Sequence, residues 1–179
     1  TATLSAQQIA ELDSRLAGLS REAQDANLRL AEQARAREQF KRLEALFTPA
    51  DAVVLRRGDE LTLRLHGLAF ASSSARLEAG ATALLERVGA ALALYPNARV
   101  AVEGHTDSSG DSVANQRLSQ QRAETVRDHL AAQAGNAASG MTAIGYGDTR
   151  PIASNEDAAG RRENRRIDLV ITPPPGTLP

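Results

Sequence analysis

Hydrophobic residues in the first quarter of the chain recur at intervals of three and four, which is the spacing of an amphipathic helix. The pattern predicts one long helix over residues 5–47. Its apolar and small residues fall on the a and d positions of a heptad seam, namely Ile9, Leu12, Leu16, Leu19, Ala23, Ala26 and Leu30. The seam weakens at Gln33 and Arg37 and returns at Phe40, Leu43 and Phe47.

The ends of this segment carry helix signals. Ser5 and Gln8 form a capping box, and Leu4 with Ile9 can form the hydrophobic staple at the start. Thr48-Pro49 ends the helix, because the residue before proline disfavours helical geometry. Two interpretations stay open: a surface helix folded back on the domain, or an extended or self-associating spacer, which the narrow seam and polar far face favour.

After Pro49 the pattern alternates between strands and helices. Val53–Leu55 and the alternating Leu61, Leu63 and Leu65 predict a hairpin with one buried face. The next elements are a helix over 78–94, a strand at 100–102 and a helix over 112–133, which is either continuous or broken near Ser119. A strand over 142–146, a loop over 148–162 that can hold one helical turn, and a strand over 167–171 follow. This order predicts an α/β (α+β) domain, β-hairpin-α-β-α-β-β, with one sheet and helices on one face.

Three segments follow from these elements. Residues 1–47 are predicted to be a helical, coiled-coil spacer, 48–172 the globular domain, and 173–179 a disordered proline-rich tail. No run of about 18 apolar residues occurs, so no segment is expected to span a bilayer. The chain begins at Thr1 without a leader, so either a signal segment has been removed or the sequence given simply starts there.

Composition excludes several function classes. The net charge is −1 and aromatic residues make up 3% of the chain, which disfavours nucleic-acid binding. The absence of cysteine excludes disulfides and thiolate chemistry. The arginines near the C-terminus, Arg161, Arg162, Arg165 and Arg166, interleave with acids, so an internally paired segment is expected there.

One acid and one guanidinium stand out as candidate ligand-binding groups. Asp107 lies in a loop after the strand at 100–103, and Arg122 lies fifteen residues later on a helix. In a continuous helix Asn115, Ser119 and Arg122 share one face. A carboxylate and a guanidinium that converge suit a small zwitterion, because each can hold the opposite charge of the ligand. The alternative is a structural ion pair that orders the loop, and the two are compatible.

The motifs around this pair resemble the OmpA-like C-terminal domain shared by OmpA, Pal and MotB. The match covers roughly 60–172 and joins three separated motifs. Its residues are Phe70, Pro96, Val102 to Asp107, Gly110, Asn115, Leu118-Ser119, Arg122-Ala123, Val126, Leu130, Gly145-Tyr146-Gly147, Pro151, Asn155, Gly160-Arg161 and Asn164-Arg165-Arg166.

This resemblance implies a mixed sheet, non-covalent binding of peptidoglycan, and a location in the periplasm of a Gram-negative envelope, associated with the outer membrane. The implied ligand is the meso-diaminopimelate of the stem peptide, with its ammonium on Asp107 and its carboxylate on Arg122. Supporting roles are expected for Thr106, Asn115, Ser119 and Arg165. One departure is that Ala71–Ser74 stands where the family often carries an acid.

Two alternatives to a binding module stay open. A peptidoglycan hydrolase would need about three metal ligands, but His66, His105 and His129 are spread over separate elements, and only His105 with Asp107 offers two. A serine triad within the loop around Ser108 has poor geometry, so no enzyme, metal or cofactor is expected. A structural or oligomerising envelope module is the other alternative, with self-association or an envelope protein as partner of residues 5–47.

Overall fold

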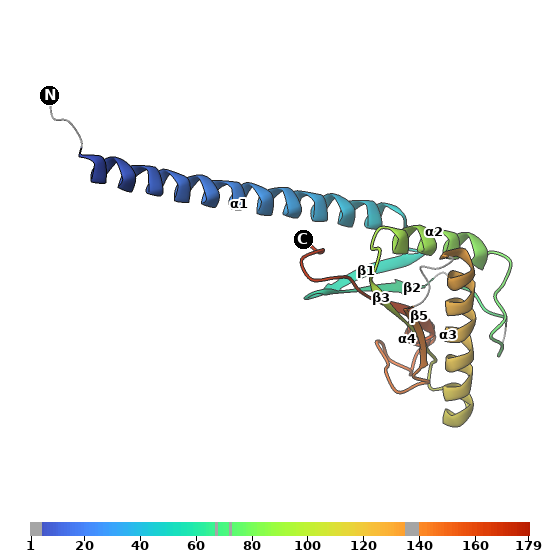
Figure 1. The fold of residues 1–179 in the computed structure, drawn as a ribbon. Helices are drawn as coiled ribbons and strands as arrows, with labels where there is room; N and C mark the ends of the chain where they lie inside the picture. The colour runs from blue at the N-terminus through green and yellow to red at the C-terminus, as the bar shows by residue number, and fades with distance from the viewer. Residues whose placement is uncertain (1–4, 67, 72, 135–139) are drawn as a thin grey trace.

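The computed structural model describes residues 5–66, 68–71, 73–134 and 140–179. A long helix, α1 (Ala6–Ala45), precedes a five-stranded domain and projects away from it (Figure 1). The other elements are β1 (Ala52–Arg57), β2 (Glu60–Leu65), α2 (Ala81–Ala93), β3 (Arg99–His105), α3 (Ser112–Ala134), β4 (Met141–Gly145), α4 (Ala158–Asn164) and β5 (Arg166–Thr172). Within the described parts of the chain, no helix combines the length and apolar character needed to cross a membrane.

The strands form one mixed sheet in the order β1-β2-β5-β3-β4. The β3–β4 pair is parallel and the other pairs are antiparallel. Alternation along β2 turns Leu61, Leu63 and Leu65 toward one buried face, where α2 and α3 cover the sheet. The predicted fold class, with its mixed sheet, is therefore confirmed.

Three local predictions are refined by the structure. The second helix begins at Ala81 rather than residue 78, because Leu77 still pairs with Phe70 in an isolated bridge. The third helix is continuous through Ser119. The segment expected to be a loop with one helical turn contains α4, whose N-terminus is capped by the Asp157 carboxylate accepting from the Gly160 N–H at 2.7 Å.

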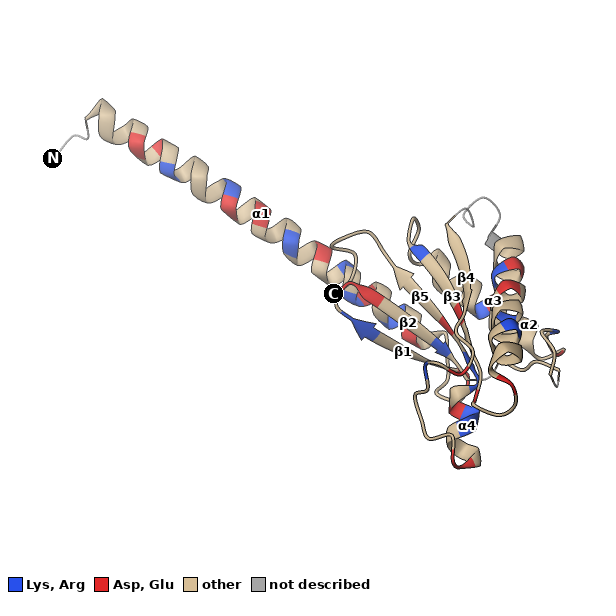
Figure 2. Cartoon of the chain, turned by 90° about the horizontal axis from the view of Figure 1, so that it is seen from below, with Lys and Arg blue, Asp and Glu red and all other residues tan. Residues whose placement is uncertain are grey.

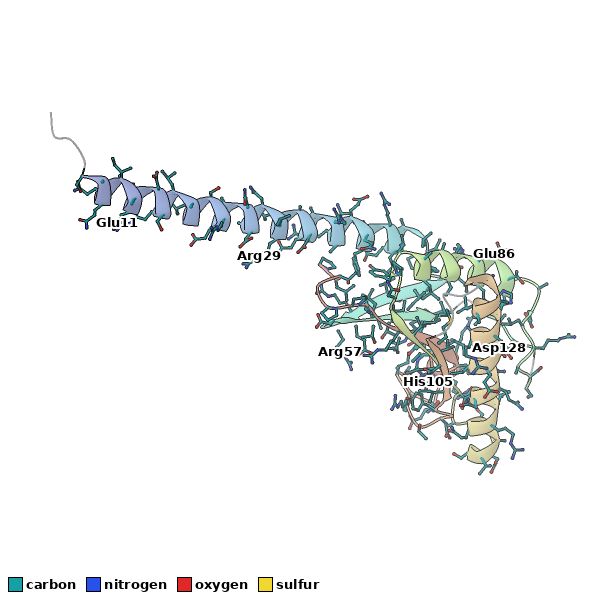
Figure 3. All side chains as sticks on the ribbon, viewed as in Figure 1. Glu11, Arg29, Arg57, Glu86, His105 and Asp128 are labelled. Carbon is teal, nitrogen blue, oxygen red and sulfur yellow. The ribbon has the colours of Figure 1, made fainter. Side chains whose placement is uncertain are left out.

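The C-terminal end of α1 is built into the domain. Leu43 is fully buried in a cluster with Leu61, Tyr95 and Ile171, and the Gln39 side-chain amide donates to the Leu94 carbonyl. We call this cluster the α1 root. Most of the rest of α1 is exposed, and Figure 3 shows Glu11 and Arg29 on the part of the helix that stands away from the sheet.

The predictions for the two ends of the chain concern the cap of α1 and the proline-rich tail. The capping box of Ser5 and Gln8 is present at the start of α1, whereas Leu4, the partner expected in the staple, lies outside the described residues. At the C-terminus, Leu178 packs, partly buried, against the α1 root. The disorder expected for 173–179 stays a prediction.

Candidate functional site: a charged cleft at one end of the sheet

A cleft of about 520 Å³ opens where β3 ends and β5 begins. It is lined from four directions: the loop after β3, the inner face of α3, the segment after β2, and the end of α4 with the start of β5. Among the predicted site residues, Thr106, Asp107, Asn115, Arg122 and Arg165 line it. Ser119 is fully buried and is not among the lining residues.

The loop that carries Asp107 is held on both sides. The Asn115 side-chain amide donates to the carbonyls of Asp107 and Ser109 at 3.3 and 3.0 Å. The Thr106 N–H donates to the Gly147 carbonyl at 2.9 Å. The buried Ser119 hydroxyl accepts from the Gly147 N–H at 2.8 Å. Because Gly147 in turn accepts from Thr106, Ser119 supports the loop indirectly. These contacts hold the backbone of the loop on either side of Asp107.

Asp107 is 7% exposed, and its ionised form is stabilised by hydrogen bonds. Oδ2 accepts from Arg165 Nη1 at 2.5 Å, and Oδ1 accepts from the Ser109 N–H at 2.9 Å. Burial by itself raises the pKa of Asp107, but the hydrogen bonds and the charge of Arg165 outweigh it, so the pKa lies below its ordinary value. The carboxylate is therefore negative near neutral pH.

The Arg122 side chain is held by a backbone carbonyl and an aromatic ring, and no carboxylate of the described residues pairs with it. Its Nε donates to the Ser74 carbonyl at 2.9 Å, and its guanidinium carbon lies 4.8 Å from the centre of the Phe70 ring. Burial lowers the pKa of Arg122, with a further lowering by Arg165 and a partial offset by Asp107. Within the described residues, the terminal nitrogens of Arg122 make no hydrogen bond, which leaves the fork available for a planar anion.

Asp107 and Arg122, the two residues predicted to bind the ligand, do not form an ion pair with each other. Asp107 and Arg122 line the same cleft, but the ion pair of Asp107 is with Arg165, across a sequence separation of 58 residues. The Ala71–Ser74 segment, where the family often has an acid, contributes a backbone carbonyl to Arg122 instead.

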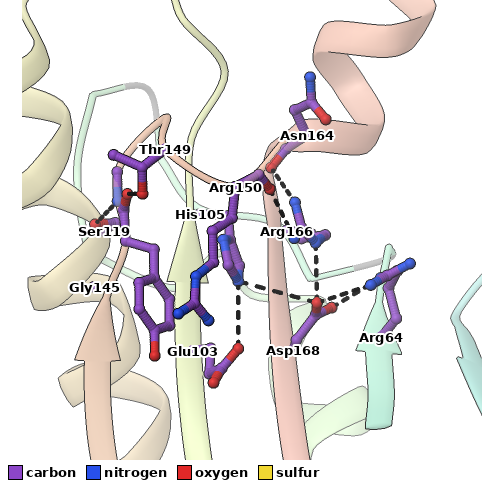
Figure 4. Close-up of polar contacts among 12 residues, drawn as sticks. Arg64, Glu103, His105, Ser119, Gly145, Thr149, Arg150, Asn164, Arg166 and Asp168 are labelled. Carbon is purple, nitrogen blue, oxygen red and sulfur yellow. Dashed lines mark hydrogen bonds and ion pairs between the residues drawn. The ribbon is translucent and has the colours of Figure 1, made fainter. Parts of the chain in front are cut away.

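A polar layer supports the cleft on the sheet face away from α2 and α3 (Figure 4). The buried Asp168 carboxylate accepts from Arg64 at 3.0 and 3.1 Å and from Arg166 at 3.0 Å. Burial raises the pKa of Asp168, but these two arginines outweigh it and the net shift is downward. Ion pairs of this kind hold β2 and β5 in register where the cleft begins.

His105 links this layer to the cleft. Its ring stacks on Tyr146, with centroids 5.4 Å apart, and Nε2 lies 3.8 Å from Glu103 and 4.0 Å from Asp168. His105 is 2% exposed, so the ring is buried within the domain. No group of three His, Asp or Glu side chains that could share a metal ion occurs in the described ranges.

Several lining residues were not singled out as site residues from the sequence. They include His66, Leu68, Phe70, His105, Arg162 and Arg166. Phe70, His105 and Arg166 belong to the family motifs, and Arg162 and Arg166 lie in the segment predicted to be internally paired with nearby acids. Arg166 is indeed paired with Asp168 at 3.0 Å, but no carboxylate lies within 4.0 Å of Arg162 among the described side chains.

The sequence model of the OmpA family matches residues 69–165, which include most of the residues that line the cleft. The probable lipoprotein YiaD of Escherichia coli is 41% identical over 121 residues, which are 67% of this chain and 55% of YiaD. The chain therefore spans about half the length of that curated relative.

Two solved structures share both sequence and fold with this chain. The cell wall anchor of the type VI secretion system from Pseudomonas aeruginosa is 33% identical, with a TM-score of 0.64, and the match covers 78% of this chain and 96% of that one. The peptidoglycan-associated lipoprotein from Burkholderia pseudomallei is 34% identical, with a TM-score of 0.51, over 58% of this chain and 87% of that one. These relatives confirm the predicted location in the Gram-negative cell envelope.

Proposed function

The chain belongs to the OmpA family, and from the charges of its cleft we propose that it binds peptidoglycan non-covalently through the meso-diaminopimelate of the stem peptide. The resemblance inferred from the sequence motifs is confirmed by the family match over 69–165. The finer proposal concerns the ligand group and the residues that hold it. Two of the relatives, a cell wall anchor and a peptidoglycan-associated lipoprotein, support it.

The observation that carries the proposal is that Asp107 and Arg122 line one cleft without pairing with each other. The free end of diaminopimelate carries an ammonium and a carboxylate on one carbon. The ammonium would donate to Asp107, and the carboxylate would accept from the terminal nitrogens of Arg122. Asn115 and Thr106 would hold the loop in place, and Arg165 would keep Asp107 ionised.

The expected affinity of one site is weak, which suits an anchor that holds through many sites at once. Two charge-assisted contacts contribute about 1.5–3 kcal/mol each, and immobilising the ligand offsets part of this. The result corresponds to millimolar to micromolar affinity for one site, roughly. Because peptidoglycan repeats its stem peptides, several domains on one assembly would hold the wall by avidity. We therefore propose a binding role without catalysis.

A titration calorimetry experiment with the full 179-residue chain tests this function. Soluble muropeptides of the diaminopimelate type and of the lysine type are compared, because lysine lacks the second carboxylate. We expect the diaminopimelate type to bind at least tenfold more tightly, since one charge-assisted contact is about 1.4 kcal/mol or more. Equal affinities would contradict the assignment of Arg122 to the ligand carboxylate.

Matched variants complete the design. Asp107→Ala and Arg122→Ala should each abolish measurable binding, because each leaves one charge of the ligand buried and unpaired. Arg117→Ala, on the same helix but outside the residues that line the cleft, is the control and should bind as the unmodified chain does. Consumption of the muropeptide during incubation with the pure protein would instead favour a hydrolase.

A structural or oligomerising role is the second candidate, and one feature of α1 favours it. Ile9, Leu12, Leu16 and Leu19 are between 46% and 65% exposed and lie along one side of the helix. Exposed leucines on a heptad seam are typical of a helix that pairs with another helix. This role is compatible with wall binding, because the seam and the cleft lie in separate parts of the chain.

A further inference from the structure

The cleft holds more positive charge than a zwitterion requires. Four guanidiniums line it, those of Arg122, Arg162, Arg165 and Arg166, against the single carboxylate of Asp107. Arg166 shares the Asp168 carboxylate with Arg64 beneath the cleft, and Arg165 pairs with Asp107. Among the described residues, this leaves Arg122 and Arg162 without a carboxylate within 4.0 Å.

A bound zwitterion would not remove this surplus. Its carboxylate would compensate Arg122, but its ammonium would share Asp107 with Arg165 and so weaken the neutralisation of that guanidinium. Arg122 and Arg165 already lie close enough for their positive charges to oppose one another, since Arg165 contributes to the lowered pKa of Arg122. A second negative group on the ligand, placed near Arg162 and Arg165, would offset this remaining positive charge.

Arg162 stands where such a group would lie. It is exposed near the C-terminal end of α4 and lines both the main cleft and the neighbouring hollow that contains His66 and Glu163. The adjacent Arg161 is tied to the carbonyls of Asn155 and Glu156, whereas no hydrogen bond to a described residue holds Arg162. Figure 2 shows the basic band of α4 at the end of the sheet where the cleft opens.

We propose that Arg162, assisted by Arg165, forms an anion subsite at the mouth of the cleft for a second carboxylate of the same stem peptide. The proposal rests on the binding of diaminopimelate in the main cleft. The residue before diaminopimelate in the stem is a glutamate joined through its side-chain carboxyl, so its main-chain carboxylate is free. That carboxylate lies one residue from the zwitterion, and an amide in its place carries no charge.

The test compares three stem tetrapeptides in calorimetric titrations of the full chain. In the first peptide the glutamate carboxylate is free, in the second it is an amide, and in the third only the C-terminal carboxylate is an amide. The unmodified chain should bind the first peptide about five- to tenfold more tightly than the second, because one charge-assisted contact at an exposed site is lost. The third peptide should bind like the first.

Protein variants assign the effect to Arg162. Arg162→Gln should bind the first and second peptides equally, with the affinity that the unmodified chain has for the second. Glu163→Gln alters the adjacent side chain without removing a cation and should retain the full preference. Because Arg162 is exposed, both variants are expected to fold, which circular dichroism checks.

The possible outcomes separate this subsite from the main proposal. Equal binding of the first and second peptides to the unmodified chain overturns the subsite and leaves diaminopimelate binding intact. A preference that survives in Arg162→Gln overturns the role of Arg162. Weak binding of the third peptide alone assigns the anion to the C-terminal carboxylate and overturns the glutamate assignment. Failure of all three peptides to bind overturns the proposed function itself.

Discussion

At the scale of single residues, the charged groups of the cleft still have room for further hydrogen bonds. Asp107 has two oxygens, of which one accepts from Arg165 and the other from a backbone N–H, and each oxygen retains a further lone pair. A ligand ammonium can therefore add to Asp107 without displacing the loop contact. Arg165 is 47% exposed, so its side chain can adjust at little cost when a cation arrives.

The ionisation of Asp107 can be tested directly. Burial of the carboxyl group raises the pKa, but Arg165 and the Ser109 N–H together lower it below the ordinary value of 3.8. A carboxylate with a lowered folded-state pKa stabilises the fold above about pH 4, and this stabilisation is lost as the pH falls through the folded-state pKa. In an NMR pH titration, we expect the Asp107 carboxyl carbon to have a midpoint below 3.8 and Arg165→Gln to move it upward.

The control for this titration is Asp51, which lies outside the cleft and whose pKa is lowered to about 2 by hydrogen bonds from Arg87 and Thr48. Its midpoint should be the same in the unmodified chain and in Arg165→Gln. A midpoint for Asp107 above 3.8 in the unmodified chain would mean that burial dominates, and the site would then lose its charge at mildly acidic pH.

Part of this site could be predicted from the sequence because its residues are close along the chain. Asp107 and Arg122 flank a strand–loop–helix unit, so local spacing was enough to place both at one end of the sheet. The partner of Asp107 could not be assigned firmly, because Arg165 reaches it only through the pairing of β3 with β5. The free charge of Arg162 was missed since interleaved acids in a sequence do not reveal which pairs form.

At the scale of elements, two glycines let α3 lie directly on the strands. A Cβ at Gly104 on β3 would overlap the backbone carbonyl of Ser119, and one at Gly145 on β4 would overlap the backbone of Gln120. The close approach also allows the Gln120 side chain to accept from the Gly145 N–H at 2.7 Å. Because α3 carries both Asn115 and Arg122, this contact sets the width of the cleft.

Gly104→Ala should therefore lower the free energy of unfolding by about 2–3 kcal/mol and weaken ligand binding, because α3 must move away from β3. Thermal and denaturant unfolding measure the first effect and titration calorimetry the second. Gly18→Ala is the matched control: it lies in α1 with no atom near its Cβ, and it should favour the helix by up to about 1 kcal/mol. Comparable stability of Gly104→Ala and the unmodified chain would show that α3 does not depend on this close contact.

The secondary structure was largely predictable because the periodicity of apolar residues is strong in each element. The differences lie at the ends of α2 and in α4, where long-range pairing and a side-chain cap decide the boundary. The pairing order of the strands is not encoded in local periodicity. The sequence order of strands predicts one sheet, but it does not reveal that the last strand, β5, lies at the centre between β2 and β3, where Ile167, Leu169 and Ile171 are buried in the core.

At the scale of the whole molecule, α1 and the domain differ in how their apolar residues are used. Forty residues at about 1.5 Å each give α1 a length of about 60 Å. Leu43, in its last turn, is buried in the root, whereas the apolar side chains nearer its start are exposed. Acidic and basic residues are interspersed along its surface (Figure 2), so the helix has no uniform charge that would repel a second copy of the chain.

We expect α1 to mediate self-association through its heptad seam. In sedimentation equilibrium across a range of concentrations, the unmodified chain should form dimers or larger species, and Leu12→Glu with Leu16→Glu should be monomeric. Gln7→Glu with Ser14→Glu adds the same charge on the opposite side of the helix and should leave association unchanged. A monomeric unmodified chain would leave α1 as a spacer that acts alone.

The α1 root and the cleft lie at opposite ends of the same strands. The root contains Leu61 and Ile171, whereas the cleft begins beyond Leu65 and includes Ile167 at the other end of β5. If the cleft is held by the wall, a pull on α1 reaches the sheet by two routes: through Leu43 in the root, and through the covalent link to β1, whose first residue, Ala52, pairs with Leu65 at the cleft end. The sheet that presents the site therefore also carries the tension placed on it.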